Sequence, residues 1–204
     1  MLKKIIQFIF SLLNHKTINT IKEQQKDEKS MNIEPTTTVA EDLRNRSNNL
    51  EERQAYAKEH GGYYFGNTSW KKLKTCDERI QIIMRELIKF FNISIDCGER
   101  NEESQTEAFL SGRSGVQYPN SMHNPDNPKN KGNEGVKAID VLPYPVDWED
   151  TERFVYMAGM IIWIAHSFGI DLRWGGDWNR DGRMRDDKER KALRDYPHFE
   201  LYLP

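Results

Sequence analysis

The chain has 204 residues and a formal net charge of -2 at pH 7. This length fits one domain with an extension, and a near-neutral charge without a basic stripe excludes nucleic acid as the expected partner. Only two cysteines, Cys76 and Cys97, are present, which excludes a disulfide framework and a thiolate zinc cluster. We expect both to be reduced thiols, and Cys97 to be a small buried side chain.

The N-terminus combines Lys3-Lys4 with an apolar run over residues 5–13. This pattern is similar to the charged and apolar parts of a secretory signal, but no small-residue cleavage site follows Leu13. The run is too short to cross a bilayer, so we expect no stable membrane span. A cleavable export signal, a helix on the membrane surface and an ordinary amphipathic extension all stay open.

Residues 17–38 are rich in charged and small polar side chains and have few large apolar ones, which is typical of a flexible linker. The next segment, from Glu41 to His60, is polar and compatible with a helix that Gly61-Gly62 would end. We therefore divide the chain into three parts: an N-terminal apolar segment with its linker (1–40), a polar helical extension (41–67) and a main domain (68–204).

Within the main domain, apolar residues recur at helical spacing over 77–91 and again over 149–168, before Gly169. Each segment predicts a helix with one face in the core. Short strands are expected over 93–96 and 170–174, where apolar and β-branched residues gather between turn residues.

Two further segments, 138–142 and 198–203, alternate polar and apolar residues and predict half-buried strands. On the second strand His198 and Glu200 share one face. Glu200 would either orient a metal-bound imidazole or be an exposed acid on an edge strand. Helices packed on a small, mainly antiparallel sheet give an α+β fold, with a metal in a groove across the sheet.

The sequence offers two imidazoles and a carboxylate as ligands for that metal. His123, Asp140 and His198 would leave a position open for water, as catalytic zinc requires. Asp195 lies shortly before His198 and would take the proton of that water. In a chain with five His and thirty-two acids, chance spacing remains the alternative explanation.

A series of short motifs extends from about Thr68 to the C-terminus. The motifs are Gly98-Glu99-Arg100 with Gln105, Ser121-x-His123, Ala138-x-Asp140, Arg173-Trp174-Gly175-Gly176-Asp177-Trp178 and Asp195-x-x-His198. In this order they resemble the motifs of the M15 zinc peptidases, in the branch of phage endolysins and bacterial cell-wall enzymes that cut L-alanyl-D-glutamate bonds. An ordered series is far more specific than any one short motif.

The resemblance implies a role for each matching residue. His123, Asp140 and His198 correspond to zinc ligands, Asp195 to the acid that acts on the attacking water, and Arg100 to an arginine that steadies the substrate carbonyl. Without the resemblance, Arg100 would be taken for an ordinary surface arginine. The remaining candidates for substrate binding or for support of the ligands are Gln105, Ser121, Trp174, Asp177, Trp178 and Glu200, with the two tryptophans as alternative members of the core.

Residues 124–137 depart from the family's pattern, which is shorter at this point. Their Pro, Asn and Gly content indicates a loop inserted beside the metal, which we expect to affect substrate preference. Asp126 or Glu134 would be competing ligands for a cation. The stretch 179–194 is expected to be a solvated loop. Four acids in and just before it are candidate calcium ligands, Asp177, Asp181, Asp186 and Asp187, but the full calcium-binding pattern is absent.

The function that the resemblance implies is hydrolysis of peptidoglycan stem peptides between L-alanine and D-glutamate. A D-alanyl-D-alanine carboxypeptidase shares the ligand set and stays open as an alternative, as does a non-catalytic module that binds the cell wall. Asp195 and Arg100 favour turnover, since a binding module needs neither. We expect a monomer that acts at the bacterial cell wall, made in the host cytoplasm as a phage or prophage product, with its route of export left open.

Overall fold

The computed structural model describes residues 47–130, 132, 135–184 and 194–203. The expected N-terminal segment and linker (1–40), and the beginning of the helix expected from Glu41, lie outside these residues. Among the described residues, no helix combines the length and the apolar character needed to cross a bilayer.

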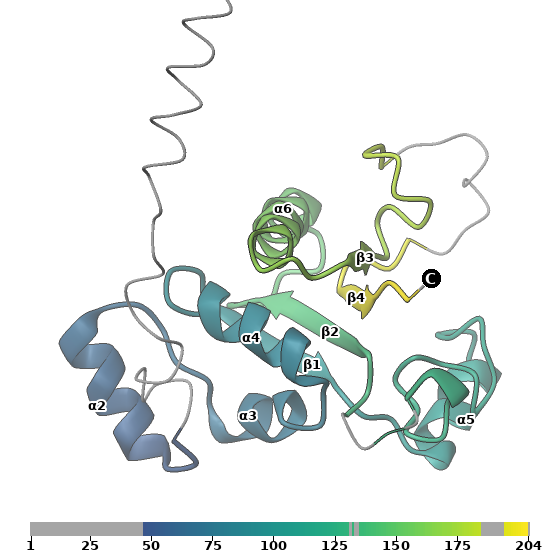
Figure 1. Ribbon diagram of the computed structural model, residues 1–204, viewed down its shortest axis with the longest axis horizontal. Helices are drawn as coiled ribbons and strands as arrows, with labels where there is room; N and C mark the ends of the chain where they lie inside the picture. The colour runs from purple at the N-terminus through teal and green to yellow at the C-terminus, as the bar shows by residue number, and fades with distance from the viewer. Residues whose placement is uncertain (1–46, 131, 133–134, 185–193, 204) are drawn as a thin grey trace, which may run out of the picture. The chain divides into compact units, whose positions relative to one another are not determined.

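Four strands form one antiparallel sheet in the order β1-β2-β4-β3 (Figure 1). The strands are β1 (Ile93–Cys97), β2 (Ala138–Pro143), β3 (Leu172–Trp174) and β4 (His198–Leu201). The two strands that carry the predicted metal ligands, β2 and β4, are therefore neighbours in the middle of the sheet. The predicted α+β fold is confirmed.

One face of the sheet is apolar because side chains alternate along each strand. Ile139, Val141, Phe199 and Leu201 join a buried cluster with residues of α4 (Glu78–Leu87) and α6 (Thr151–Ser167). The polar alternates, such as Asp140 and His198, consequently face the other way. The helices thus hold the sheet from one side and leave its polar face for the site.

The helix α4 begins at a buried carboxylate. Asp77 caps it by accepting from the backbone N–H of Arg79, and its other oxygen pairs with the Arg79 guanidinium and with buried Lys137 at 3.4 Å. Burial alone would raise the pKa of Asp77, but the hydrogen bonds and charge of Arg79, with the charge of Lys137, lower it below its ordinary value. This group ties α4 to the chain entering β2.

Among the described residues, two α-helices were not predicted from the sequence, α3 (Asn67–Leu73) and α5 (Glu102–Leu110), and neither was the short 3₁₀ helix η2 (Pro128–Asn130). The helices and strands predicted within the main domain are present with small shifts of their ends, whereas the helix expected from Glu41 begins only at Leu50. The helix expected over 77–91 stops at Leu87, and the strand expected over 198–203 stops at Leu201.

The helix α2 (Leu50–His60) begins after Asn49, which caps Glu51, and ends at Gly61, whose φ of 73° favours glycine. Its Arg53 is fully buried: the guanidinium donates to the Phe65 carbonyl and to Asn67 and lies over the Trp70 ring. The boundary expected between 67 and 68 therefore falls in the first turn of α3, and the three-part division stays a prediction.

Candidate metal centre and active site

A pocket of about 1010 Å³ contains most of the predicted site residues. Three of the candidates, Gln105, Trp174 and Asp177, do not line it. Those that do line it come from separate segments of the chain and are Arg100, Ser121, His123, Asp140, Trp178, Asp195, His198 and Glu200.

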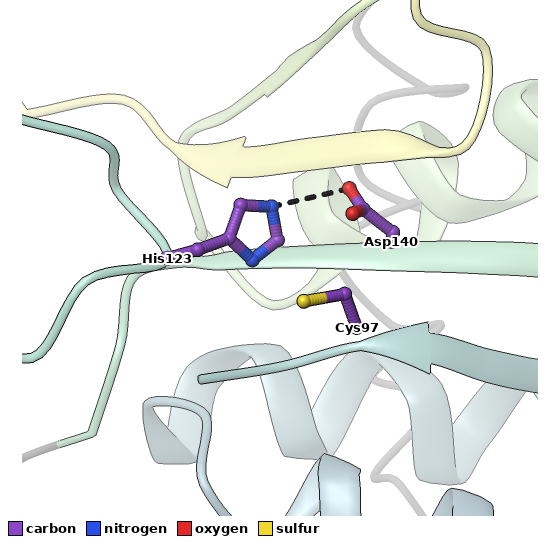
Figure 2. A group of neighbouring side chains, drawn as sticks. All are labelled: Cys97, His123 and Asp140. Carbon is purple, nitrogen blue, oxygen red and sulfur yellow. Dashed lines mark hydrogen bonds and ion pairs between the residues drawn. The ribbon is translucent and has the colours of Figure 1, made fainter. Parts of the chain in front are cut away.

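Three potential ligand atoms lie at equal distances from one another. His123 Nε2, Asp140 Oδ1 and His198 Nδ1 are separated by 3.1 Å in each pair, and Figure 2 shows the His123–Asp140 side of this triangle. Two ligands about 2.0–2.1 Å from a tetrahedral zinc ion are about 3.3–3.4 Å apart. These atoms are therefore spaced as ligands of a single ion.

The backbone places these donors together. Asp140 is paired with His198 across β2 and β4, so both side chains stand on the same face of the sheet. His123 comes from the segment after α5, where its N–H donates to Ser121 Oγ at 3.2 Å and its carbonyl accepts from the N–H of Arg100 at 2.8 Å. Ser121 thus supports the turn that carries His123.

Each imidazole has its other ring nitrogen engaged. His123 Nδ1 donates to the Gly98 carbonyl at 2.7 Å, because a carbonyl can only accept, and this leaves Nε2 free for the centre. His198 Nε2 faces Glu200 Oε2 at 3.2 Å, which leaves Nδ1 free. Such partners fix the orientation of metal-binding histidines and increase their basicity.

Glu200 is itself held by its neighbours. It is paired with Arg173 across β4 and β3, and its Oε1 accepts from the Arg173 guanidinium, at 2.9 Å from Nε. Burial alone would raise the pKa of Glu200, but His198 and Arg173 lower it. Glu200 is buried on a central strand, so the alternative of an exposed acid on an edge strand is wrong.

The buried donors form a strongly coupled charged group. Burial alone would lower the pKa of His123, but the charge of Asp140 raises it to about 10. Asp140 in turn has its pKa lowered by the two histidines despite its burial. A carboxylate held ionised among buried imidazoles attracts a cation, which a proton supplies in the absence of a metal.

Arg100 holds the second oxygen of Asp140. Its Nη2 donates to Asp140 Oδ2 at 3.1 Å, while Nη1 donates to Gln105 Oε1 at 3.2 Å. Gln105 is fully buried and donates in turn to the Val116 carbonyl at 2.7 Å. Gln105 therefore holds one side of the Arg100 guanidinium in place.

Asp195 is fixed by a glycine of the Arg173–Trp178 motif. The N–H of Asp195 donates to the Gly175 carbonyl at 3.0 Å, and the N–H of Gly175 donates to the His198 carbonyl at 2.8 Å. A Cβ at Gly175 would overlap the Asp195 carbonyl and lie 2.9 Å from its Cβ. Burial, the largest cause, raises the pKa of Asp195, although the nearby His198 opposes this.

The rest of that motif divides between the pocket and the core. Trp178 lines the pocket with its ring centroid 5.4 Å from that of His198. Trp174 is buried between Tyr196 and Phe199 instead, so the core alternative holds for it. Asp177 accepts from the N–H groups of Asp181 and Gly182 and stabilises the following turn.

The first half of the inserted segment, residues 124–130, is held by side-chain hydrogen bonds that its composition did not indicate. Asn124, Asn127 and Asn130, three residues apart, are all buried. Their amides donate to the carbonyls of Arg100, Ser121 and Met122 respectively. The Asn-x-x-Asn-x-x-Asn pattern was the available signal for this scaffold, and it was missed. Of the possible competing ligands, Asp126 accepts from Tyr118, while Glu134 lies outside the described residues, as do Asp186 and Asp187 of the calcium alternative.

Cys97 contributes a second possible donor group that the sequence did not indicate. One donor atom each from Cys97, His123 and Asp140 lie within 4.8 Å of one another (Figure 2). The pair of His123 and Asp140 therefore has two further possible donors beside it, His198 and Cys97. Cys97 is only half-buried and lies outside the hydrophobic core, so its expected place as a small buried side chain is wrong.

The α+β fold brings this donor set, an arginine and a further acid into one pocket, an arrangement typical of metal-dependent hydrolases. The chain belongs to the family of phage L-alanyl-D-glutamate peptidases, whose family model matches residues 61–202. It is 29% identical over 144 residues to the L-alanyl-D-glutamate peptidase of Escherichia phage T5, and this alignment covers 68% of this chain and 98% of the relative.

A solved structure shares the fold. The crystal structure of the Serratia marcescens L-Ala D-Glu endopeptidase ChiX matches with a TM-score of 0.51 and 22% sequence identity. The match covers 72% of this chain and 95% of that one. At this identity the likeness supports the fold only.

Proposed function

We propose that this chain is a zinc-dependent endopeptidase that hydrolyses the L-alanyl-D-glutamate bond of peptidoglycan stem peptides. The observation that carries the proposal is the triangle of 3.1 Å between His123 Nε2, Asp140 Oδ1 and His198 Nδ1, in the pocket that Arg100 and Asp195 also line. Two nitrogens and one oxygen are the donor set of catalytic zinc sites that keep a position open. The assignment of the cleaved bond is supported by the family to which the chain belongs.

Zinc in this site would supply a Lewis acid for the scissile carbonyl and a lowered pKa for the attacking water. The residues that hold it are already oriented, His123 by Gly98 and His198 by Glu200. Preorganised ligands need little rearrangement on binding.

Asp195 is the proposed general base. Its carboxylate lines the pocket beside the ligands, and burial raises its pKa toward the pH at which a base is effective. It would take a proton from the attacking water and return one to the departing amine of D-glutamate. Its backbone bond to Gly175 holds it at that place.

Arg100 is the proposed partner of the developing oxyanion. The guanidinium is held by Asp140 and Gln105 and lines the pocket with its side chain 20% exposed. A fixed donor is most effective where it needs no reorganisation as charge develops on the substrate oxygen. Trp178, also in the pocket, would contact the stem peptide.

The experiment is zinc titration of metal-free protein, followed by cleavage of a synthetic peptide that contains both an L-Ala–D-Glu bond and a terminal D-Ala–D-Ala. Zinc should restore cleavage at L-Ala–D-Glu, and His123→Ala should neither bind zinc nor cleave. His166 is an exposed histidine on α6, so the control variant His166→Ala should bind zinc and cleave the peptide like wild type. Release of terminal D-alanine alone would favour the carboxypeptidase, and zinc binding without cleavage would favour the binding module.

The biological setting is part of the proposal. We propose a monomer whose partner is bacterial peptidoglycan, made as a phage or prophage product and acting in lysis of the host wall. This setting is supported by the relative from Escherichia phage T5, which is aligned with this chain over 98% of its own length.

A further inference from the structure

Cys97 is brought to the candidate metal centre by an irregularity in the sheet. Along β1, Ile95 is paired with Val141, but the next pair is Cys97 with Asp140. Asp96 is therefore an extra, unpaired residue that forms a β-bulge in β1. The bulge places Cys97, and not Asp96, opposite Asp140. Because directly opposed residues share a face, Cys97 stands beside Asp140, and the carboxylate of Asp96 does not take that place.

The thiol is close to the ligands and weakly engaged. Its sulfur turns toward the imidazole of His123 (Figure 2), within the 4.8 Å group that these residues form with Asp140. The thiol donates a long hydrogen bond to the Gly98 carbonyl at 3.5 Å, although that carbonyl already accepts from His123 Nδ1 at 2.7 Å, and the thiol also interacts with the His123 imidazole. A thiol is a weak donor, so little is lost when it leaves this carbonyl.

The remaining distance to a shared ion is small. A sulfur about 2.3 Å and a nitrogen about 2.0–2.1 Å from a tetrahedral zinc ion are about 3.6 Å apart. The Cys97 sulfur lies within 4.8 Å of one donor atom of His123 and one of Asp140, so a rotation of the Cys97 side chain has to shorten these two separations by roughly 1 Å at most. Sulfur is a preferred donor for zinc.

We propose that Cys97 is a fourth, displaceable donor of the metal centre, which closes the position for the attacking water at rest and leaves it when substrate enters. The S–H proton passes to solvent as the metal–sulfur bond forms, and a proton returns when that bond breaks. This inference rests on the proposed function, since it requires a metal held by His123, Asp140 and His198. A simple space-filling role would instead place Cys97 in the core, where Cys76 lies.

The experiment is absorption spectroscopy of the cobalt(II)-loaded protein. Wild type should show the near-ultraviolet sulfur-to-cobalt charge-transfer band together with the visible bands of bound cobalt. Cys97→Ala should keep the visible bands and lose the charge-transfer band, and the control Cys76→Ala should keep both. Zinc should bind about tenfold or more weakly to Cys97→Ala, a loss typical of removing a group that supports a metal site.

Displacement is tested in the Asp195→Asn background, where turnover is expected to be slow enough for the bound substrate to be observed. Adding the L-Ala–D-Glu peptide should diminish the charge-transfer band. A band that persists at saturating peptide overturns displacement, and visible cobalt bands without any charge-transfer band in wild type overturn the role of Cys97 while leaving the peptidase proposal intact. Failure of cobalt and zinc to bind at all would overturn both.

Discussion

Gly175 and Asp195 are in direct backbone contact, although they belong to different segments of the chain. The N–H of Asp195 donates to the Gly175 carbonyl at 3.0 Å, and the space that a Gly175 Cβ would need is filled by Asp195. The φ angle of Gly175 is not in the left-handed region. Close approach of the backbones, and not an unusual turn, therefore requires glycine here.

Gly175→Ala should displace Asp195 without removing a metal ligand. We expect kcat to fall by about 10-fold to 100-fold, since small misplacements of a catalytic group cost this much, while zinc content is retained. Gly159→Ala is the matched control, because no atom lies within 4 Å of a Cβ built there in α6. It should keep full activity and stabilise the helix by about 0.5–1 kcal/mol. Equal activity of the two variants would contradict the positioning role of Gly175.

Asp195→Asn and His198→Ala should separate catalysis from metal binding. Asp195→Asn should bind zinc like wild type and lose about 10²–10⁴-fold in kcat, the usual contribution of a general base. His198→Ala should lose both zinc and activity. Metal analysis of the dialysed proteins, with peptide cleavage followed in parallel, gives the comparison. Wild-type turnover by Asp195→Asn would remove the proposed base.

Glu200→Gln should weaken the metal centre through His198. The charged partner of His198 Nε2 is lost while the shape of the side chain is kept, so we expect the zinc dissociation constant to rise about 10–100-fold. Competition with a chromogenic chelator measures it. Glu107→Gln, which breaks an exposed ion pair with Arg113, should leave zinc affinity unchanged. If both variants bind zinc equally, Glu200 does not orient the ligand.

Asp77 should make folding stability depend on pH. Its folded pKa is lower than its unfolded value of about 3.9. The ionised carboxylate therefore favours the folded state above the unfolded pKa, and this contribution disappears as pH falls through the folded pKa. At pH 7, Asp77→Asn should lower the free energy of unfolding by about 1.5–3 kcal/mol, as for a hydrogen bond to a charged group.

The matched measurement is urea unfolding of wild type and Asp77→Asn between pH 7 and pH 3. Asparagine can still cap α4, so the variant isolates the charge. The difference between the two proteins should be constant near neutral pH and shrink below about pH 4, near the unfolded pKa of aspartate. A difference that does not change with pH would show that the charge of Asp77 contributes nothing.

The two central strands, and the shared face of Asp140 and His198, were predictable because both strands alternate polar and apolar residues. Alternation along β2 and β4 places Asp140 and His198 on the polar face, and the register of the two strands confirms it. The helix α5 has no comparable signature, because only Gln105 and Ala108 are buried along it. A buried glutamine that positions an arginine gives no apolar periodicity to detect.

Other features depend on contacts between distant segments. The orientation of Cys97 follows from a bulge that becomes visible only when β1 is paired with β2. The sequence left both the groove and the core open for Trp174, and its stacking on Tyr196 and Phe199 places it in the core. Local composition cannot supply such long-range pairings.

The most direct test of the proposed function is mass spectrometry of the soluble fragments that the zinc-loaded protein releases from purified peptidoglycan, beside His123→Ala. We expect fragments with a new N-terminal D-glutamate from the wild-type protein and none from the variant. Loss of terminal D-alanine alone, or equal products from the two proteins, would contradict a zinc-dependent L-alanyl-D-glutamate endopeptidase.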